Sequence, residues 1–134
     1  MIRPSRTRPT GPADPAIAFK PEVAPAADET IIAKQANSAF IGTDLHRHLH
    51  DIDAPALVIL GVITNNSLEA TVRNAGNLGH AVFVPEDACF TYGWQDLRGK
   101  LWAAEDVHAL SLANLHGEYA MVTSSAEILA NVPA

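Results

Sequence analysis

The sequence predicts an α/β protein in which a mostly parallel sheet lies between two layers of helices. From residue 29 onward, short apolar segments alternate with segments that have helical periodicity. Two of the apolar segments, residues 55–63 and 80–84, show no alternation of polar and apolar side chains. Strands that are covered on both faces have this pattern, and they occur in parallel sheets. Repeated β-α units with right-handed crossovers build such a sheet.

Composition excludes several classes of partner. A chain of 134 residues fits one domain. Its net charge is −6 and it has no basic patch outside the N-terminus, so we expect no nucleic-acid partner. No apolar run is long enough to span a membrane. Cys89 is the single cysteine, which fits a reducing compartment and predicts a cytoplasmic protein.

Residues 1–28 predict an irregular N-terminal arm, and residues 29–134 predict the domain. The arm is rich in Pro, Arg, Ser and Thr and lacks the apolar core of a secretory signal. An organelle transit peptide is the alternative, but proline opposes the amphipathic helix that such peptides need. An irregular surface arm is therefore the expectation.

The predicted elements follow one another as four strand–helix pairs. Strands are expected at residues 30–34, 55–63, 80–84 and 118–123, with the first one ending at Lys34. Thr43 caps a first short helix, and Gly79 ends a second. A third helix spans residues 105–116 after a long loop, and Ser124 with Glu127 forms the capping box of a fourth. The apolar face of the second helix comprises Leu68, Val72, Ala75 and Leu78.

Chemistry is expected where the strands end, because ligands of open α/β sheets bind beyond the carboxyl ends of strands. Lys34 ends one strand, the turn Thr64-Asn65-Asn66-Ser67 follows the next, and Asp87 lies just past a third. The first turn of a helix offers free N–H groups and the positive end of the dipole, which can hold an oxyanion. Ser67 is thus a candidate nucleophile. The alternative is a plain N-cap, a role in which serine is common.

Other candidates have structural alternatives. His46 and His50 have the i, i+4 spacing of a metal pair, but a solvated helix face is the favoured interpretation. His108 lies on an apolar stripe and is expected to be a satisfied core residue. Cys89 does not start a helix, so we do not expect it to be the nucleophile. Trp94 and Trp102 flank the long loop and line either a pocket or a subunit contact.

Three segments resemble the isochorismatase-like cysteine hydrolases. IIAKQANSAFIGTDL is similar to the family segment that delivers a lysine, and LVILGVITNNSLEATVRNAGNLG is similar to its nucleophile segment. EDACFTYG and AEDVHALSLANLHGEYA continue the pattern, and the match runs from Lys20 to Leu129. The resemblance implies a Rossmann-like hydrolase fold with an Asp-Lys-Cys triad.

The resemblance assigns roles to residues of this chain. Lys34 takes the place of the family lysine and Ser67 that of the cysteine, while the family aspartate belongs to a first strand ahead of anything that matches here. It also implies a cis Val62–Ile63 peptide and an oxyanion hole formed by the amides of Ile63 and Ser67. No metal or cofactor is expected. The expected pocket comprises Asn65, Asn66, Asp87, Phe90 and Trp94.

The same comparison predicts a partial isochorismatase fold that lacks the first two strands. The strand at residues 57–62 would then have an open edge, which invites pairing. Residues 30–34 could move in beside it, another chain could cover it, or the reading frame is a fragment. The predicted function is hydrolysis of a small amide, ester or vinyl ether by a homo-oligomer. The alternative is an inactive member that binds a ligand or a subunit, or a fragment.

Overall fold

The computed structural model describes residue 19 and residues 21–131, so most of the predicted arm lies outside the described residues. Its elements, in chain order, are η2 (Pro21–Val23), α1 (Leu45–Asp51), β1 (Leu57–Val58), β2 (Gly61–Val62), η3 (Thr64–Leu68), α2 (Glu69–Asn77), β3 (Val82–Pro85), η4 (Glu86–Ala88), β4 (Cys89–Phe90), β5 (Trp94–Gln95), β6 (Leu101–Trp102), α3 (Ala104–Leu115), β7 (Met121–Thr123) and α4 (Ser125–Asn131).

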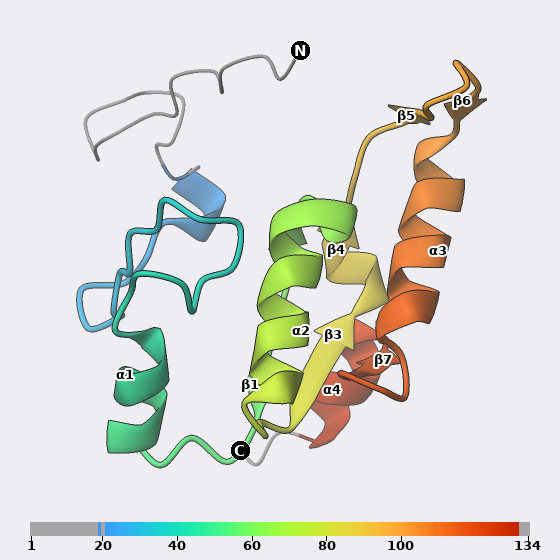
Figure 1. Cartoon of the computed structure of the whole chain (residues 1–134). Helices are drawn as coiled ribbons and strands as arrows, with labels where there is room; N and C mark the ends of the chain where they lie inside the picture. Colours follow the sequence, from blue (N-terminus) through green and yellow to red (C-terminus); the bar gives the residue numbers. More distant parts are fainter. Residues whose placement is uncertain (1–18, 20, 132–134) are drawn as a thin grey trace.

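The predicted α/β class is confirmed. A parallel sheet runs in the order β1-β3-β7, and β2 pairs in parallel with β4. Only the small β5–β6 hairpin is antiparallel within the described part of the chain. Figure 1 shows α2 in front of the sheet, α4 behind it and α3 beside β7. The sheet therefore lies between helical layers, and the unbroken apolar segment at residues 80–84 correctly predicts the buried strand β3.

The core lies between the sheet and helices α2 and α3. Val82 and Val84 of β3 face it, and Val72 and Ala75 of α2 are fully buried against them. Leu68 adds to the same face of α2, and Leu112 and Leu115 of α3 complete the cluster. The predicted apolar face of α2 is confirmed except at Leu78, which is exposed one residue beyond the helix end.

The predicted capping box of the last helix is confirmed. The Glu127 amide donates to Ser124 Oγ at 3.2 Å, and the Ser124 amide donates to Glu127 Oε2 at 3.4 Å. Asp87 adds a second cap, because its carboxylate accepts bonds from both the amide and the hydroxyl of Ser125. α4 is thus held to the end of β3 by side chains from two segments.

The prediction of a strand at residues 30–34 is wrong. These residues have no regular structure, and β1 is an edge strand of its sheet. A strand requires a neighbouring strand that completes its hydrogen bonds, and no described strand pairs with residues 30–34. Residues 30–34 therefore do not pair with the open edge of residues 57–62, which was one of the expected possibilities.

The segment 55–63 is a strand only in part. It forms two short strands, β1 and β2, separated by Ile59 and Leu60. Leu57 and Ile59 direct their amides to β3, while Val58, Leu60 and Val62 expose 47%, 60% and 49% of their surfaces. The expectation that both faces are covered is wrong, because nothing in the described part of the chain lies over these three side chains.

The long loop holds more structure than its sequence predicts. Cys89 and Phe90 form β4 beside β2, and residues 94–102 fold back as the β5–β6 hairpin. These strands have two residues each, too short to show an alternating pattern. No helix of the described residues is long and apolar enough to cross a membrane.

Asp87→Asn is expected to lower stability above pH 4 and to change it little in strong acid. The Ser125 hydroxyl and amide hold the pKa of Asp87 below its ordinary value of 3.8. A lowered pKa stabilises the fold above the unfolded value, and this contribution disappears as the pH falls through the folded value. Thermal unfolding between pH 2 and pH 7 would measure the difference.

The neighbouring Glu86→Gln is the control, because Glu86 is exposed and its side chain makes no hydrogen bond or ion pair within the described region. A difference between Asp87→Asn and the native protein that stayed constant down to pH 2 would contradict the role of Asp87 as a charged cap.

Candidate functional site

The candidate site is the turn that joins β2 to α2. The Val62–Ile63 peptide is cis, as the resemblance implies. The Ile63 carbonyl then accepts the amides of Asn66 at 3.1 Å and Leu68 at 3.3 Å, which closes a wide π turn over Thr64–Leu68. The turn lies at the carboxyl end of β2, where ligands of parallel sheets bind.

Ser67 lies inside this turn and is half-buried. The N-cap interpretation is wrong, since the N-cap positions of the turn and of α2 fall on Ile63 and Leu68. The Ser67 carbonyl accepts a bond from Thr71 Oγ1 at 2.7 Å, while its hydroxyl has no hydrogen-bond partner among the described residues. That hydroxyl is therefore available to a ligand.

The amide of Ile63 makes no hydrogen bond with any described residue. Ser67 follows four residues later, within the first turn of the helical segment, where backbone N–H groups lack acceptors in the preceding turn. The backbone amides of Ile63 and Ser67 are donors of the type that stabilises an oxyanion. An oxyanion hole formed by the amides of Ile63 and Ser67 therefore remains a prediction, and the backbone of this turn is compatible with it.

Neighbouring side chains brace the turn. Thr64 is fully buried, and its hydroxyl bonds His108 Nδ1 of α3 at 3.0 Å. The expected hydrogen-bonded state of His108 is therefore confirmed, but its expected place in the core is wrong, since His108 is only half-buried. Asn65 Oδ1 accepts a bond from Thr91 Oγ1 at 2.6 Å. The turn is thus tied to α3 on one side and to the segment after β4 on the other.

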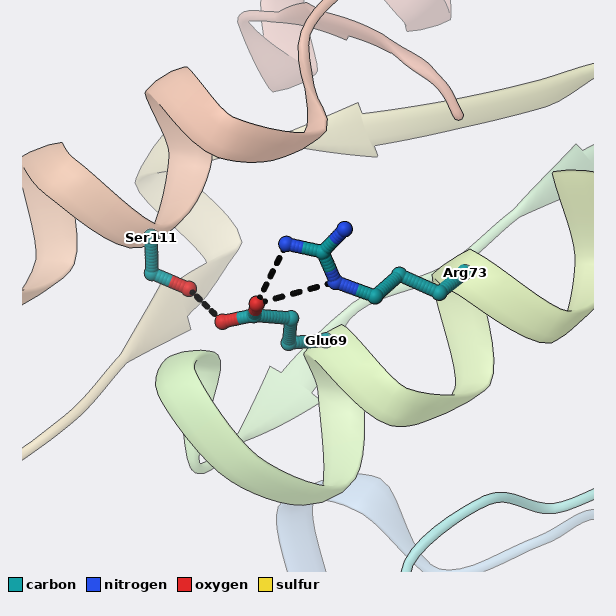
Figure 2. Close-up of polar contacts among 3 residues, drawn as sticks. All are labelled: Glu69, Arg73 and Ser111. Atoms are coloured by element: carbon teal, nitrogen blue, oxygen red, sulfur yellow. Dashed lines mark hydrogen bonds and ion pairs between the residues drawn. The ribbon is translucent and has the colours of Figure 1, made fainter. Parts of the chain in front are cut away.

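A carboxylate network joins the start of α2 to α3 (Figure 2). Glu69 Oε1 accepts bonds from Arg73 Nε at 3.0 Å and Nη2 at 2.8 Å, and Oε2 accepts the Ser111 hydroxyl at 2.7 Å. The hydrogen bond to Glu69 raises the pKa of Arg73 above its ordinary value. The guanidinium also lies over the Tyr119 ring, 4.7 Å from its centroid. The i, i+4 spacing of Glu69 and Arg73 is the sequence signal for this pair, but neither residue is among the predicted site residues.

Lys34 is exposed, and its ammonium group donates to the carbonyls of Ala36 at 3.0 Å and Asn37 at 2.7 Å. No hydrogen bond joins it to Ser67 within the described part of the chain. The segment that follows Lys34 does reach α2, because the Ala39 amide donates to Thr71 Oγ1 and Asn74 donates to Ser38 Oγ. The lysine segment is therefore anchored one turn after Ser67.

The expected pocket residues do not all meet in one place. Asn65 and Trp94 line a groove of about 630 Å³ along α3, together with Trp102 and Leu110. Neither Ser67 nor Lys34 lines this groove, and Asn66, Asp87 and Phe90 also lie elsewhere. Phe90 is exposed on β4 beside Val62, and Asp87 caps α4.

The remaining candidates have clear positions. Cys89 is buried beside Gly61, and burial raises the pKa of its thiol, which opposes a reactive thiolate. His46 Nδ1 lies 3.3 Å from His80 Nε2, and Phe40 stacks on the His80 ring. His46 thus contacts the loop before β3, while His50 lies beside Asp51. No group of three potential metal ligands occurs within the described ranges.

This chain resembles known proteins in both sequence and structure. The model of the isochorismatase domain family matches residues 4–127, a range that includes much of the arm. The isochorismatase family protein YrdC of Bacillus subtilis is 34% identical over 118 residues, which cover 88% of this chain and 63% of the relative. Nicotinamidase 3 of Arabidopsis thaliana is 31% identical over 87 residues, covering 65% of this chain and 38% of that protein.

A solved structure from Chromobacterium violaceum, described as an isochorismatase-family protein, superposes with a TM-score of 0.87 at 54% identity. The superposition covers 92% of this chain and 66% of that one. A structure from Oleispira antarctica gives a TM-score of 0.84 at 32% identity, covering 90% and 63%. The chain therefore spans less than two thirds of the length of these proteins and of YrdC.

Glu69→Ala is expected to lower the free energy of unfolding by about 2 kcal/mol, because it removes a carboxylate that pairs with Arg73 and Ser111. Chemical denaturation measures this change, and Ser111→Ala should give a smaller loss that does not add fully to it. Glu118→Ala is the control, since Glu118 is exposed and has no side-chain partner in the described structure. Equal stabilities of Glu69→Ala and the control would rule out the network as a brace.

Proposed function

Because the chain belongs to the isochorismatase family, we propose that it carries the nucleophile junction of a hydrolase that acts on a small amide, ester or vinyl ether. The observation that carries the proposal is the position of Ser67. Its hydroxyl lies at the carboxyl end of β2, in the turn leading to α2, and the Ile63 amide lies in the same turn; neither has a hydrogen-bond partner among the described residues.

In this proposal Ser67 Oγ attacks the electrophilic carbon of the substrate. The hydroxyl proton passes to the neutral amine of Lys34, and the developing oxyanion accepts bonds from the amides of Ile63 and Ser67. The proton is then returned to the leaving group, and water hydrolyses the covalent intermediate. Serine–lysine pairs perform this chemistry in unrelated hydrolases.

This mechanism requires Lys34 to be neutral and to reach Ser67. Its ammonium donates to two carbonyls and is exposed, conditions that favour the charged form. To act as a base, Lys34 must exchange these carbonyls for Ser67 and lose its proton to solvent. Two hydrogen bonds support this step, because the Ala39 amide donates to Thr71 and Asn74 donates to Ser38, which holds the segment after Lys34 beside α2.

The substrate class rests on relatives. One relative is named a nicotinamidase, and the family is named after an isochorismatase. We propose that this chain shares that range of small molecules. We also propose that it forms a homo-oligomer in the cytoplasm. The exposed apolar side chains of β1 and β2 support self-association, and the buried, unpaired Cys89 suits a reducing compartment.

Ser67→Ala is expected to lower kcat/KM for the best substrate of a small-amide and ester panel by at least about a thousandfold, because it removes the attacking oxygen. Lys34→Ala should cause a loss of similar size, and the two losses should not multiply in the double variant. Asn77→Ala, at the exposed far end of α2, is the control that should retain activity. Hydrolysis that persists unchanged in Ser67→Ala would refute the mechanism, and an inactive native protein would favour the binding-domain alternative.

Ser67→Cys tests the turn without any substrate. In a Cys89→Ala background, the introduced thiol should react with iodoacetamide with a pKa below the ordinary 8.5, because the first helical turn stabilises a thiolate. Cys89 in the native chain should react slowly until the protein unfolds, since burial raises its thiol pKa. The pH dependence of the labelling rate measures both. A midpoint at or above 8.5 for Ser67→Cys would show that the turn is not poised for catalysis.

A further inference from the structure

The β5–β6 hairpin presents a rigid apolar tip. Asp96 organises residues 96–100: its carboxylate accepts the amides of Arg98 at 2.9 Å and Lys100 at 3.0 Å, and the indole of Trp102 at 3.0 Å. Lys100 Nζ lies 3.3 Å from the centroid of the Trp102 ring. Leu97 is fully exposed at this tip, and Leu101 exposes 73% of its surface. A preformed tip loses little conformational entropy when it binds.

A groove suited to such a tip lies at the base of the same hairpin. It has a volume of about 630 Å³ and runs along α3, with Trp94, Trp102, Val107 and Leu110 among its walls. Leu110 exposes 66% of its surface although it belongs to a helix whose opposite face is core. Figure 1 shows the hairpin extending beyond the N-terminal end of α3, so the tip and the groove are neighbours on one side of the molecule.

Charges on the two features are complementary. Arg98 is exposed on the tip next to Leu97, and its guanidinium has no partner among the described residues. Asp106 lines the groove, is exposed, and also lacks a side-chain partner there. An apolar anchor beside a cation therefore matches an apolar groove beside an anion. One chain carries both halves, which is the condition for an isologous contact with two-fold symmetry.

We propose that two copies of this chain associate by reciprocal insertion, with Leu97 of each protomer in the α3 groove of its partner and Arg98 against Asp106. The proposal names the contact for the self-association proposed above and rests on it. Nothing in it depends on Ser67 or on hydrolysis. A second copy is the favoured occupant because the chain itself supplies an apolar anchor with the complementary charge.

Light scattering coupled to size exclusion is the first test, over a range of protein concentrations. The native protein should show twice the chain mass of 14.3 kDa. Leu97→Asp should raise the dissociation constant at least about thirtyfold, the effect expected of a central apolar anchor. Arg98→Glu and Asp106→Arg should each weaken the dimer, and the two together should restore it, because the pair is then re-formed with reversed signs. Circular dichroism checks that each variant is folded.

A cross-linking experiment tests the geometry directly. In a Cys89→Ala background, a mixture of the Leu97→Cys and Leu110→Cys variants should form a disulfide-linked heterodimer on oxidation, whereas Leu97→Cys alone should cross-link far less. Absence of the heterodimer would overturn the proposal.

The outcomes separate the claims. A native protein that is monomeric at every concentration overturns self-association altogether and leaves the hydrolysis proposal to its own assay. An oligomer that survives Leu97→Asp but dissociates on Leu60→Lys overturns hairpin exchange and assigns the contact to the exposed β1 and β2 residues. Lack of rescue by the Arg98→Glu and Asp106→Arg pair likewise rejects the proposed register.

Discussion

The packing of α2 against β3 is the interaction on which the candidate site depends. Val72, Ala75 and Val84 are fully buried in this contact. Gly76 makes a close approach possible at the next position, since a Cβ there would lie 2.8 Å from the Tyr119 carbonyl oxygen. Any larger residue at position 76 must push α2 away from the segment before β7. Because the turn Thr64–Leu68 leads directly into α2, the position of this helix against the sheet determines where the site residues lie.

The turn η3 and the start of α2 present residues to two different surfaces. Asn65 and Glu69, four residues apart, both line the groove toward α3, whereas Ser67 lies between them in sequence and lines no part of it. One short segment therefore contributes residues to the groove and places Ser67 outside it. The network of Glu69, Arg73 and Ser111 holds the groove side in place without occupying the Ser67 side.

The sequence predicts the layered architecture, the helices and the cap of α4 well, because these follow from local periodicity and side-chain chemistry. Residues 30–34 show its limit: their β-branched composition suits a strand, but a strand also needs a neighbour, which composition does not report. The β5–β6 hairpin has too few residues for a pattern. The family resemblance indicated the cis Val62–Ile63 peptide, which no periodicity could reveal. The division of the expected pocket residues between the groove and other surfaces depends on three-dimensional packing, so Asn65 and Phe90 could not be separated beforehand.

Asn65 has a consequence for the behaviour of the whole protein. It lies two residues before Ser67, lines the α3 groove, and is bonded to Thr91 on the way to the hairpin. In the proposed dimer, a ligand that shifted the turn would change the affinity of the groove for the partner's Leu97, and thermodynamic linkage makes such an effect equal in the other direction. The affinity of the proposed substrate would then depend on total protein concentration by mass action, so a dilute sample and a concentrated one would give different binding curves.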